Sequence, residues 1–146
     1  MENDACTMTF LSLDRGNSEA VYKKLKKIIE PKLCYNNVFL VISHYQEKFF
    51  TGKWKVAYGY VSSVQPIYCR HCFIIGEDGN VIDPTIFASG NQTEERKYYV
   101  TKVFEKLEEY LSAVESEGNM PALERYLRKE DARAAEIALQ NNMLFI

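Results

Sequence analysis

Residues 67–85 read IYCRHCFIIGEDGNVIDPT, and this stretch predicts a β-hairpin that carries one histidine and one aspartate. β-branched and aromatic residues over 67–75 and 80–82 favour strands, and residues 76–79, Gly-Glu-Asp-Gly, favour the turn between them. For His71 to lie directly opposite Asp83, the turn must centre on residue 77, the mean of 71 and 83. A two-residue turn at 78–79 would put Asp83 on the wrong face, so we expect a wider or bulged turn.

The same strand contains a CxxC pattern, Cys69-Arg70-His71-Cys72. Alternate residues of a strand point to opposite faces, so His71 shares a face with Cys69 and Phe73 while Cys72 faces the other way. The two thiols are then about 10 Å apart, too far for a disulfide and wrongly directed for one metal ion. A metal or dithiol site would need this segment to be a tight turn instead. The prediction is two structural cysteines.

Two helices are expected upstream of the hairpin. Residues 18–30 have apolar residues at helical spacing, with Asn17 or Ser18 as the cap and Pro31 as the end. Residues 33–50 are apolar nearly all round at first, which is typical of a buried helix, and Cys34 lies in its first turn. Trp54–Ser62 adds a strand before the hairpin, so we predict an antiparallel meander.

The rest of the chain is expected to be helical. Residues 93–117 carry apolar residues at helical spacing and predict the longest helix, which Gly118-Asn119 ends. Residues 121–128 and 130–141 predict two shorter helices before the apolar tail 143–146. No repeat or composition shift indicates a second domain, so residues 1–146 are interpreted as one α+β domain with a helical C-terminal region, 93–146.

Composition excludes several classes of protein. Apolar residues make up 47% and charged residues 26% of the 146, which is globular composition, and the net charge of -2 gives no attraction toward nucleic acid or anionic membranes. The first 13 residues lack the basic start and long apolar core of a secretory signal, and no window is long enough to span a membrane. We therefore expect a soluble, cytoplasmic protein whose four cysteines, Cys6 included, are not in disulfides.

Cys34, His71 and Asp83 stand in the order of a cysteine nucleophile, its imidazole base and the acid that orients the base. A thiolate is favoured by the positive end of a helix dipole and by a neighbouring imidazolium, and Cys34 is placed to use both. The only other histidine, His44, lies ten residues later in the same helix, about 15 Å along its axis, and is a poor base for this thiol. Taken singly, each of the three residues is more simply explained as structural.

The motifs resemble those of the papain-like and transglutaminase-like superfamily, most of all small phage and bacterial proteins and NlpC-type peptidases. The residues that carry the resemblance are Cys34-Tyr35-Asn36-Asn37, Ala57-Tyr58-Gly59-Tyr60-Val61, His71-Cys72-Phe73 and 79–85, Gly-Asn-Val-Ile-Asp-Pro-Thr. The match covers about residues 33–87, the core motif region. It implies a papain-like core in which a nucleophile helix packs on a small antiparallel sheet, with Cys34, His71 and Asp83 as the catalytic residues.

Two departures from the family pattern stand out. Phe73 occupies a position that is often tryptophan, and the oxyanion-hole glutamine of papain has no counterpart before Cys34. Oxyanion stabilisation is therefore left to backbone amides or to Asn37.

The leading functional hypothesis is a cysteine-dependent acyl-transfer enzyme, a peptidase, amidase or transglutaminase-like protein that acts on a peptide, amide or protein substrate without cofactor or metal. The alternative is an inactive binding protein on the same fold, such as a phage-encoded inhibitor or ligand sponge. In both, the expected cleft is lined by Tyr35, Asn37, Tyr58, Tyr60 and Phe87. A third hypothesis assigns dimerisation or partner docking to the C-terminal helices and the tail, residues 143–146.

Overall fold

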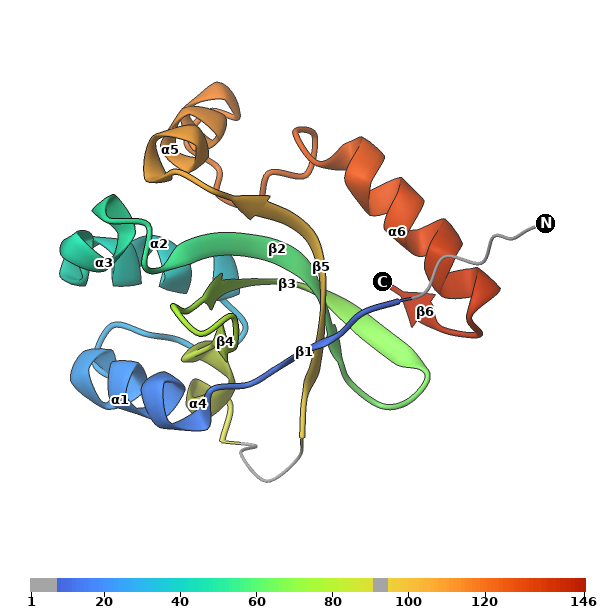
Figure 1. Ribbon diagram of the computed structural model, residues 1–146, viewed down its shortest axis with the longest axis horizontal. Helices are drawn as coiled ribbons and strands as arrows, with labels where there is room; N and C mark the ends of the chain where they lie inside the picture. Colours follow the sequence, from blue (N-terminus) through green and yellow to red (C-terminus); the bar gives the residue numbers. More distant parts are fainter. Residues whose placement is uncertain (1–7, 91–94) are drawn as a thin grey trace.

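The computed structural model describes residues 8–90 and 95–146 and has a mixed α+β fold (Figure 1). Over these residues the elements in chain order are β1 (Leu11–Ser12), α1 (Arg15–Leu25), α2 (Cys34–His44), α3 (Gln46–Phe50), β2 (Lys55–Ser62), β3 (Ile67–Ile75), β4 (Val81–Ile82), α4 (Thr85–Ala88), β5 (Lys97–Phe104), α5 (Leu107–Ser116), α6 (Arg128–Gln140) and β6 (Leu144–Phe145). Within the described ranges, none of the helices has the length and apolar content needed to cross a membrane.

One curved sheet organises the molecule, with strand order β1-β5-β2-β3-β4 (Figure 1). The expected antiparallel meander of β2, β3 and β4 is confirmed. The C-terminal strand β6 pairs in parallel with the start of β3, at Ile67 and Tyr68, whereas β4 pairs with its end, at Ile74 and Ile75. Because β2 covers the other edge of β3, β4 and β6 share one edge, and His71 lies in the interval between them.

The hairpin register differs from the one predicted. Ile74 pairs with Ile82 and Ile75 with Val81, so the turn comprises residues 76–80 and centres on residue 78, not 77. The turn is wide, as expected, and Gly79 adopts a positive φ of 86° that favours glycine. In this register Asp83 continues opposite Phe73, not opposite His71. Since 73 and 71 share a face, Asp83 becomes a diagonal neighbour of His71 on the expected side of the sheet.

The two faces of the sheet bury different cores. One face, with Tyr58, Cys72 and Ile74, packs against apolar residues of α1, α2, α3 and α5. The other, with Ala57, Phe73 and Tyr98, packs against residues around β1. Cys72 and Phe73 therefore face opposite ways, as alternation predicts.

The N-terminal helices have different bounds from those predicted. α1 begins at Arg15 because the Asp14 carboxylate accepts the backbone N–H of Asn17 at 3.0 Å, so neither Asn17 nor Ser18 is the cap. The predicted helix over 33–50 is two helices, which meet at Tyr45 with non-helical φ and ψ of -134° and 40°. α2 keeps the expected start at Cys34.

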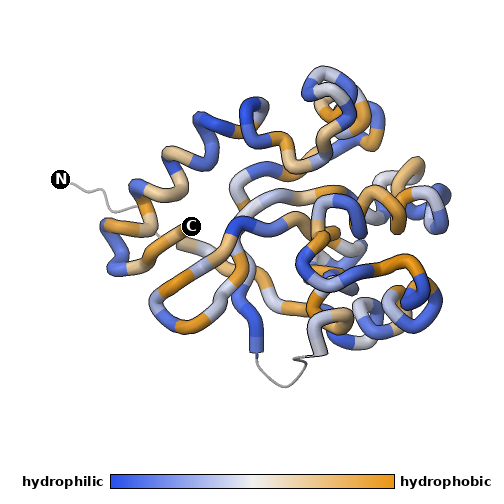
Figure 2. The backbone as a smooth tube through the Cα atoms, turned by 180° about the vertical axis from the view of Figure 1, so that it is seen from behind, coloured by the Kyte–Doolittle hydropathy of each residue, from blue (hydrophilic) through white to orange (hydrophobic). Residues whose placement is uncertain are grey.

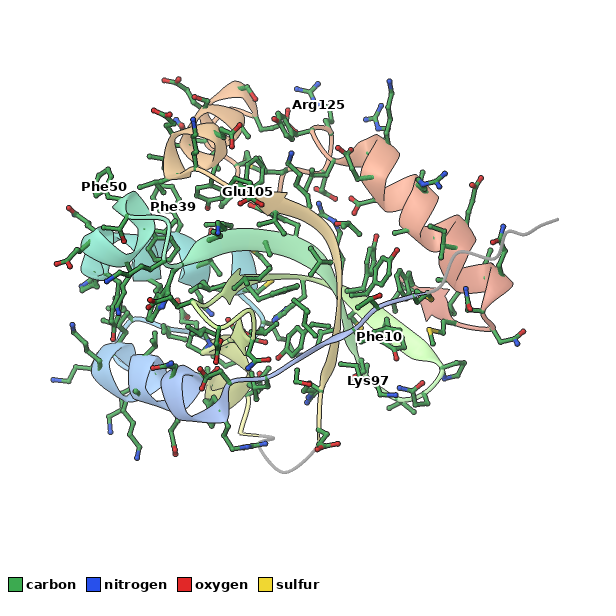
Figure 3. All side chains as sticks on the ribbon, viewed as in Figure 1. Phe10, Phe39, Phe50, Lys97, Glu105 and Arg125 are labelled. Carbon is green, nitrogen blue, oxygen red and sulfur yellow. The ribbon has the colours of Figure 1, made fainter. Side chains whose placement is uncertain are left out.

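The predicted helix over 93–117 is wrong over residues 97–104, and its first two residues, 93 and 94, lie outside the described residues. Lys97–Phe104 is strand β5, which pairs with both β1 and β2, and the helix α5 begins only at Leu107. Lys97 and Phe10 lie together next to β1 (Figure 3), with the Lys97 ammonium 5.9 Å from the ring centroid of Phe10. The C-terminal region is therefore not purely helical, because one of its segments is a central strand.

The last part of the chain also departs from the prediction. Residues 121–127 form turns instead of a helix, and α6 runs from Arg128 to Gln140. α6 lies at the periphery, and hydrophilic and hydrophobic residues alternate along it (Figure 2). The apolar tail folds back as β6, where Phe145 is buried and stacks on Tyr60 with ring centroids 4.4 Å apart.

Candidate functional site

Cys34 is the first residue of α2, at the helix end where backbone N–H groups lack helical acceptors. The first backbone hydrogen bond of the helix runs from the Asn37 N–H to the Leu33 carbonyl at 2.8 Å, and no described side chain caps this end. The Cys34 thiol thus lies at the positive end of the helix dipole. It is also nearly enclosed, since the residue is 6% exposed.

His71 and Asp83 form a direct pair. Nε2 of His71 lies 2.8 Å from Oδ2 of Asp83, and both side chains are buried. Cys34 lies close enough to the same imidazole to raise the pKa of His71. Because Nε2 is taken by the carboxylate, Nδ1 is the ring nitrogen left for the thiol. The structure therefore brings together all three residues of the predicted triad.

The pKa of His71 is raised by its partners. Burial of the ring favours the neutral form and lowers the pKa, but the charge of Asp83 and the hydrogen bond to it act in the opposite direction, with a smaller contribution from Cys34. The result is a pKa of about 10, against an ordinary value of 6.5. The imidazole is therefore protonated at neutral pH and can serve as a proton donor.

Two further residues hold Asp83. The Tyr98 hydroxyl on β5 donates to Oδ2, the oxygen that binds His71, at 2.7 Å, and the Asp83 backbone N–H donates to the Ser18 hydroxyl of α1 at 2.9 Å. The other carboxylate oxygen, Oδ1, is buried and has no hydrogen-bond partner among the described residues. Asp83 itself is fully buried. Its backbone position and one of its two oxygens are therefore fixed by separate elements.

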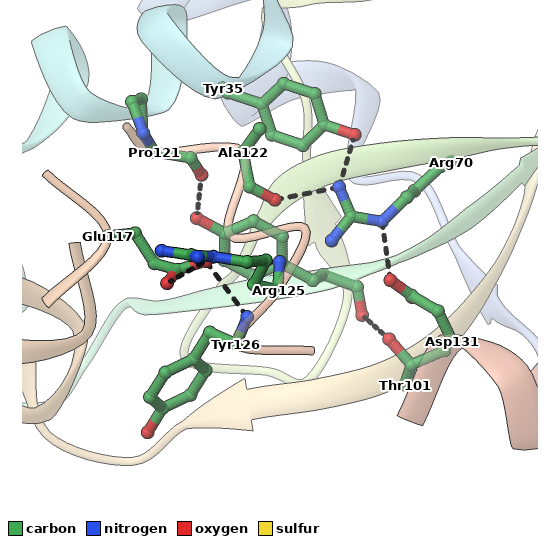
Figure 4. A network of polar contacts seen from close by, with 10 residues as sticks. Tyr35, Arg70, Thr101, Glu117, Pro121, Ala122, Arg125, Tyr126 and Asp131 are labelled. Carbon is green, nitrogen blue, oxygen red and sulfur yellow. Dashed lines mark hydrogen bonds and ion pairs between the residues drawn. The ribbon is translucent and has the colours of Figure 1, made fainter. Parts of the chain in front are cut away.

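A polar network braces the first turn of α2 (Figure 4). Arg70 on β3 donates through Nη1 to the Tyr35 hydroxyl at 2.9 Å and to the Ala122 carbonyl at 2.8 Å, and through Nε to Asp131 of α6 at 2.9 Å. Tyr35 follows Cys34 in the chain and stacks on Tyr58 with ring centroids 6.1 Å apart. Burial raises the pKa of Tyr35 to about 12, so its hydroxyl stays neutral. This network ties α2 to the sheet and to α6.

Asn37, also in the first turn of α2, links this helix to Glu30 and Thr85. Its Nδ2 donates to the Glu30 carbonyl at 2.7 Å and to the Thr85 hydroxyl at 3.0 Å, and its Oδ1 accepts the Glu30 N–H at 3.1 Å. Both amide hydrogens are therefore in use within the protein. The N–H donors without helical acceptors beside Cys34 are the backbone groups of the first turn of α2.

The residues expected to line a cleft do not come together as one surface. Tyr58 is fully buried, and its hydroxyl donates to the Pro121 carbonyl. Tyr60 packs on Phe145, and Phe87 packs on Tyr22 of α1 with ring centroids 6.3 Å apart. Of the aromatic residues predicted to contact a substrate, Tyr35 and Tyr58 are the pair tied to the first turn of α2.

The remaining candidate residues lie outside this arrangement. His44 is exposed at the end of α2, and its Nδ1 lies 3.2 Å from the Leu40 carbonyl oxygen. Cys34, Cys69 and Cys72 are free thiols, whereas Cys6 lies outside the described residues. Over 8–90 and 95–146, no group of three or more His, Cys, Asp or Glu side chains could hold a metal ion.

Sequence reasoning missed Ser18, Arg70 and Tyr98. Tyr98 was assigned to a helix, although residues 97–104, KYYVTKVF, are rich in the β-branched and aromatic residues that favour strands. That composition was a usable signal. Ser18 and Arg70 carry no comparable signal, because their partners are 65 and 61 residues away in the chain.

Comparison with known proteins gives no match to this chain, whether among family models, curated proteins or solved structures. The function of this chain is therefore inferred from the site itself.

Proposed function

We propose that this protein is a cysteine-dependent acyl-transfer enzyme that acts on an amide bond, with Cys34 as nucleophile, His71 as general base and acid, and Asp83 as the residue that orients the imidazole. The observation that carries the proposal is the 2.8 Å contact between His71 Nε2 and Asp83 Oδ2, with Cys34 beside the same ring at a helix N-terminus. A helix that begins at the cysteine and packs against β3, which carries the histidine, with the aspartate directly after β4, also supports a papain-like arrangement.

The proposed reaction has two halves. The Cys34 thiolate attacks the carbonyl carbon, and the new C–S bond gives a tetrahedral intermediate whose oxyanion is held by N–H groups of the first turn of α2. The C–N bond then breaks, and the leaving amine takes the proton from His71 Nδ1. In the second half, water or an amine gives its proton to Nδ1 as it attacks the acyl-enzyme, and the C–S bond breaks to restore the thiolate.

The raised pKa of His71 fits the first half of this reaction better than the second. A protonated imidazole is the state that donates to a leaving amine, and at a pKa of about 10 it is the resting state at neutral pH. The proton leaves His71 with the first product, so the imidazole is neutral when water or an amine attacks the acyl-enzyme. The Cys34 thiol beside this imidazole attacks as the thiolate.

Activity against a panel of peptidyl anilides and isopeptides tests the proposal. We expect the native protein to release amine and the Cys34→Ala variant to be inactive, whereas Cys69→Ala retains activity. Cys69 is a suitable control because it is a free, partly exposed cysteine on the same strand as His71. Equal activity of Cys34→Ala and the native protein would refute the assignment.

One observation favours the second candidate, a binding protein on the same fold. Cys34 and His71 are 6% and 8% exposed, and Tyr35, Asn37 and Tyr58 are all engaged in internal hydrogen bonds. A substrate must therefore displace part of this packing to reach the thiol. Tight binding of a ligand whose affinity is unchanged in Cys34→Ala, together with no turnover by the native protein, would favour the binding protein over the enzyme.

A further inference from the structure

The two oxygens of the Asp83 carboxylate have different surroundings, and a Cys-His-Asp triad alone does not explain the difference. Two donors, His71 Nε2 at 2.8 Å and the Tyr98 hydroxyl at 2.7 Å, share the single oxygen Oδ2. The second oxygen, Oδ1, is buried without a partner among residues 8–90 and 95–146. A triad needs only one of these donors. The second comes from a residue that is fully buried on a different strand.

We propose that Tyr98 is a positioning residue of this site, which holds Asp83 Oδ2 against His71 and takes up part of the negative charge of the carboxylate. This inference rests on the proposed Cys-His-Asp function for its purpose, although its geometry stands independently. A carboxylate whose charge is shared with a phenol is a weaker partner for the imidazolium. Tyr98 thereby eases the release of the His71 proton that the reaction requires.

The packing of the Tyr98 ring fixes the position of its hydroxyl. Its ring lies edge-on to Phe73 with centroids 5.0 Å apart and 6.4 Å from the ring of His71, so the hydroxyl has little freedom to turn away. Burial and the neighbouring Asp83 charge raise the pKa of Tyr98 well above its ordinary value, which keeps the hydroxyl a donor. The strand position also matters, because Tyr98 pairs with Val61 of β2 and Leu11 of β1 and is held on both sides.

The titratable and charged groups around the pair come from several elements. Cys34 of α2 and Asp83 after β4 act on His71. Tyr98 itself is influenced by Asp83 and, with smaller effects, by Arg96 just before β5 and Arg15 of α1. Replacing Tyr98 by phenylalanine removes only its hydroxyl and leaves each of these titratable and charged groups in place.

The test is the titration of the His71 imidazole by NMR in the native protein, Tyr98→Phe and Tyr99→Phe. His44, the other histidine, is exposed and serves as the internal reference. Tyr99→Phe is the matched control, because Tyr99 is the next residue of β5 and packs with Phe10 and Phe145 in a different cluster. We expect Tyr98→Phe to raise the proton affinity of His71 by about threefold to tenfold, since the carboxylate loses a donor. Tyr99→Phe should leave it unchanged.

Two results would contradict different claims. A raised midpoint in the native protein that Tyr98→Phe does not move, or moves downward, overturns the role of Tyr98 alone, even if the variant is less stable. A native midpoint near 6.5 contradicts the charged Cys34–His71–Asp83 site itself. Uniform incorporation of 3-fluorotyrosine, a stronger donor, needs no substitution at position 98. It should lower the midpoint, and a rise would overturn the proposal.

Discussion

At the scale of single residues, the main interaction is the contact between the buried side chains of His71 and Asp83. The pKa of His71 is raised above 6.5, so the pair stabilises the folded state fully below pH 6.5, and this contribution is lost as the pH rises through about 10. We therefore expect the free energy of unfolding of the native protein to exceed that of His71→Gln by about 3 kcal/mol near pH 6.5, since the variant leaves Asp83 without its charged partner.

The difference between the two proteins should shrink steadily toward pH 10. Urea unfolding of both proteins at intervals between these limits measures it, and other titrating groups cancel in the comparison. A difference that stays constant or grows with pH would show that the imidazole is neutral in the folded state.

At the residue scale, chemistry and chain order were enough to choose three residues that the structure brings together. Cys34, His71 and Asp83 could be chosen because few alternatives exist, with only two histidines in the chain. Asn37 was chosen for a free amide, yet its hydrogen bonds to Glu30 and Thr85 depend on a distant segment that the sequence does not indicate.

Asn37 makes a testable contribution to the stability of α2. Replacing it by alanine leaves the Glu30 peptide groups and the Thr85 hydroxyl without partners, which should cost about 2 to 4 kcal/mol. Asn36→Ala is the control, because Asn36 is exposed and its side chain makes no hydrogen bond among the described residues, and it should change stability by less than about 0.5 kcal/mol. Equal effects of both substitutions on chemical denaturation would contradict this assignment.

At the scale of elements, the sequence was most informative for the meander. Ile67–Ile75 was predicted with its observed bounds, since an unbroken run of strand-forming residues ends at a glycine turn. The hairpin centre was displaced by one residue because the prediction required His71 and Asp83 to be directly opposite, whereas a diagonal contact also brings them together. β5 was missed because its apolar residues also fit helical spacing.

The contact between β2 and β5 makes Gly59 the most restricted glycine near the site. Gly59 pairs with His71, and a Cβ built on it would lie 1.8 Å from the Tyr99 carbonyl oxygen, where the register of β2 and β5 shifts. Gly59→Ala should therefore destabilise the protein by more than about 3 kcal/mol.

Gly16→Ala is the matched control for this prediction, because a Cβ there meets no atom closer than 3.8 Å and the residue is helical. It should be neutral or stabilise the protein by up to about 1 kcal/mol. Thermal unfolding of both variants measures these changes in stability. A Gly59→Ala protein as stable as the native one would mean that β2 and β5 are not in close contact at Gly59.

At the scale of the whole molecule, the C-terminal tail adds strand β6 beside the start of β3. Phe145 is buried against Tyr60 and Tyr68, whereas Ile146 is 64% exposed. Phe145→Ala should cost about 3 to 4 kcal/mol, and Ile146→Ala less than about 0.5 kcal/mol. Denaturation together with light scattering checks both. If Phe145→Ala kept full stability but changed the mass of the particle in solution, the tail would be an interface.

The whole-molecule architecture was predictable only in outline. An α+β fold followed from the helical and strand patterns along the chain, but the way β6 returns to the edge of β3 did not, because a two-residue strand has no pattern of its own. The covering of the thiol is also a property of the whole fold. It depends on the packing of α2 against β3, two elements that are distant in the chain.

The pairing of Cys34 with His71 is tested by the rate at which iodoacetamide alkylates Cys34 across pH, measured by mass spectrometry in the native protein and in His71→Ala. Cys69, a partly exposed thiol in the same chain, is the internal reference. If Cys34 and His71 share an ion pair, Cys34 in the native protein reacts at acidic pH, and His71→Ala abolishes that reaction while Cys69 is unaffected. Identical pH profiles for Cys34 in the two proteins would contradict the proposed catalytic site.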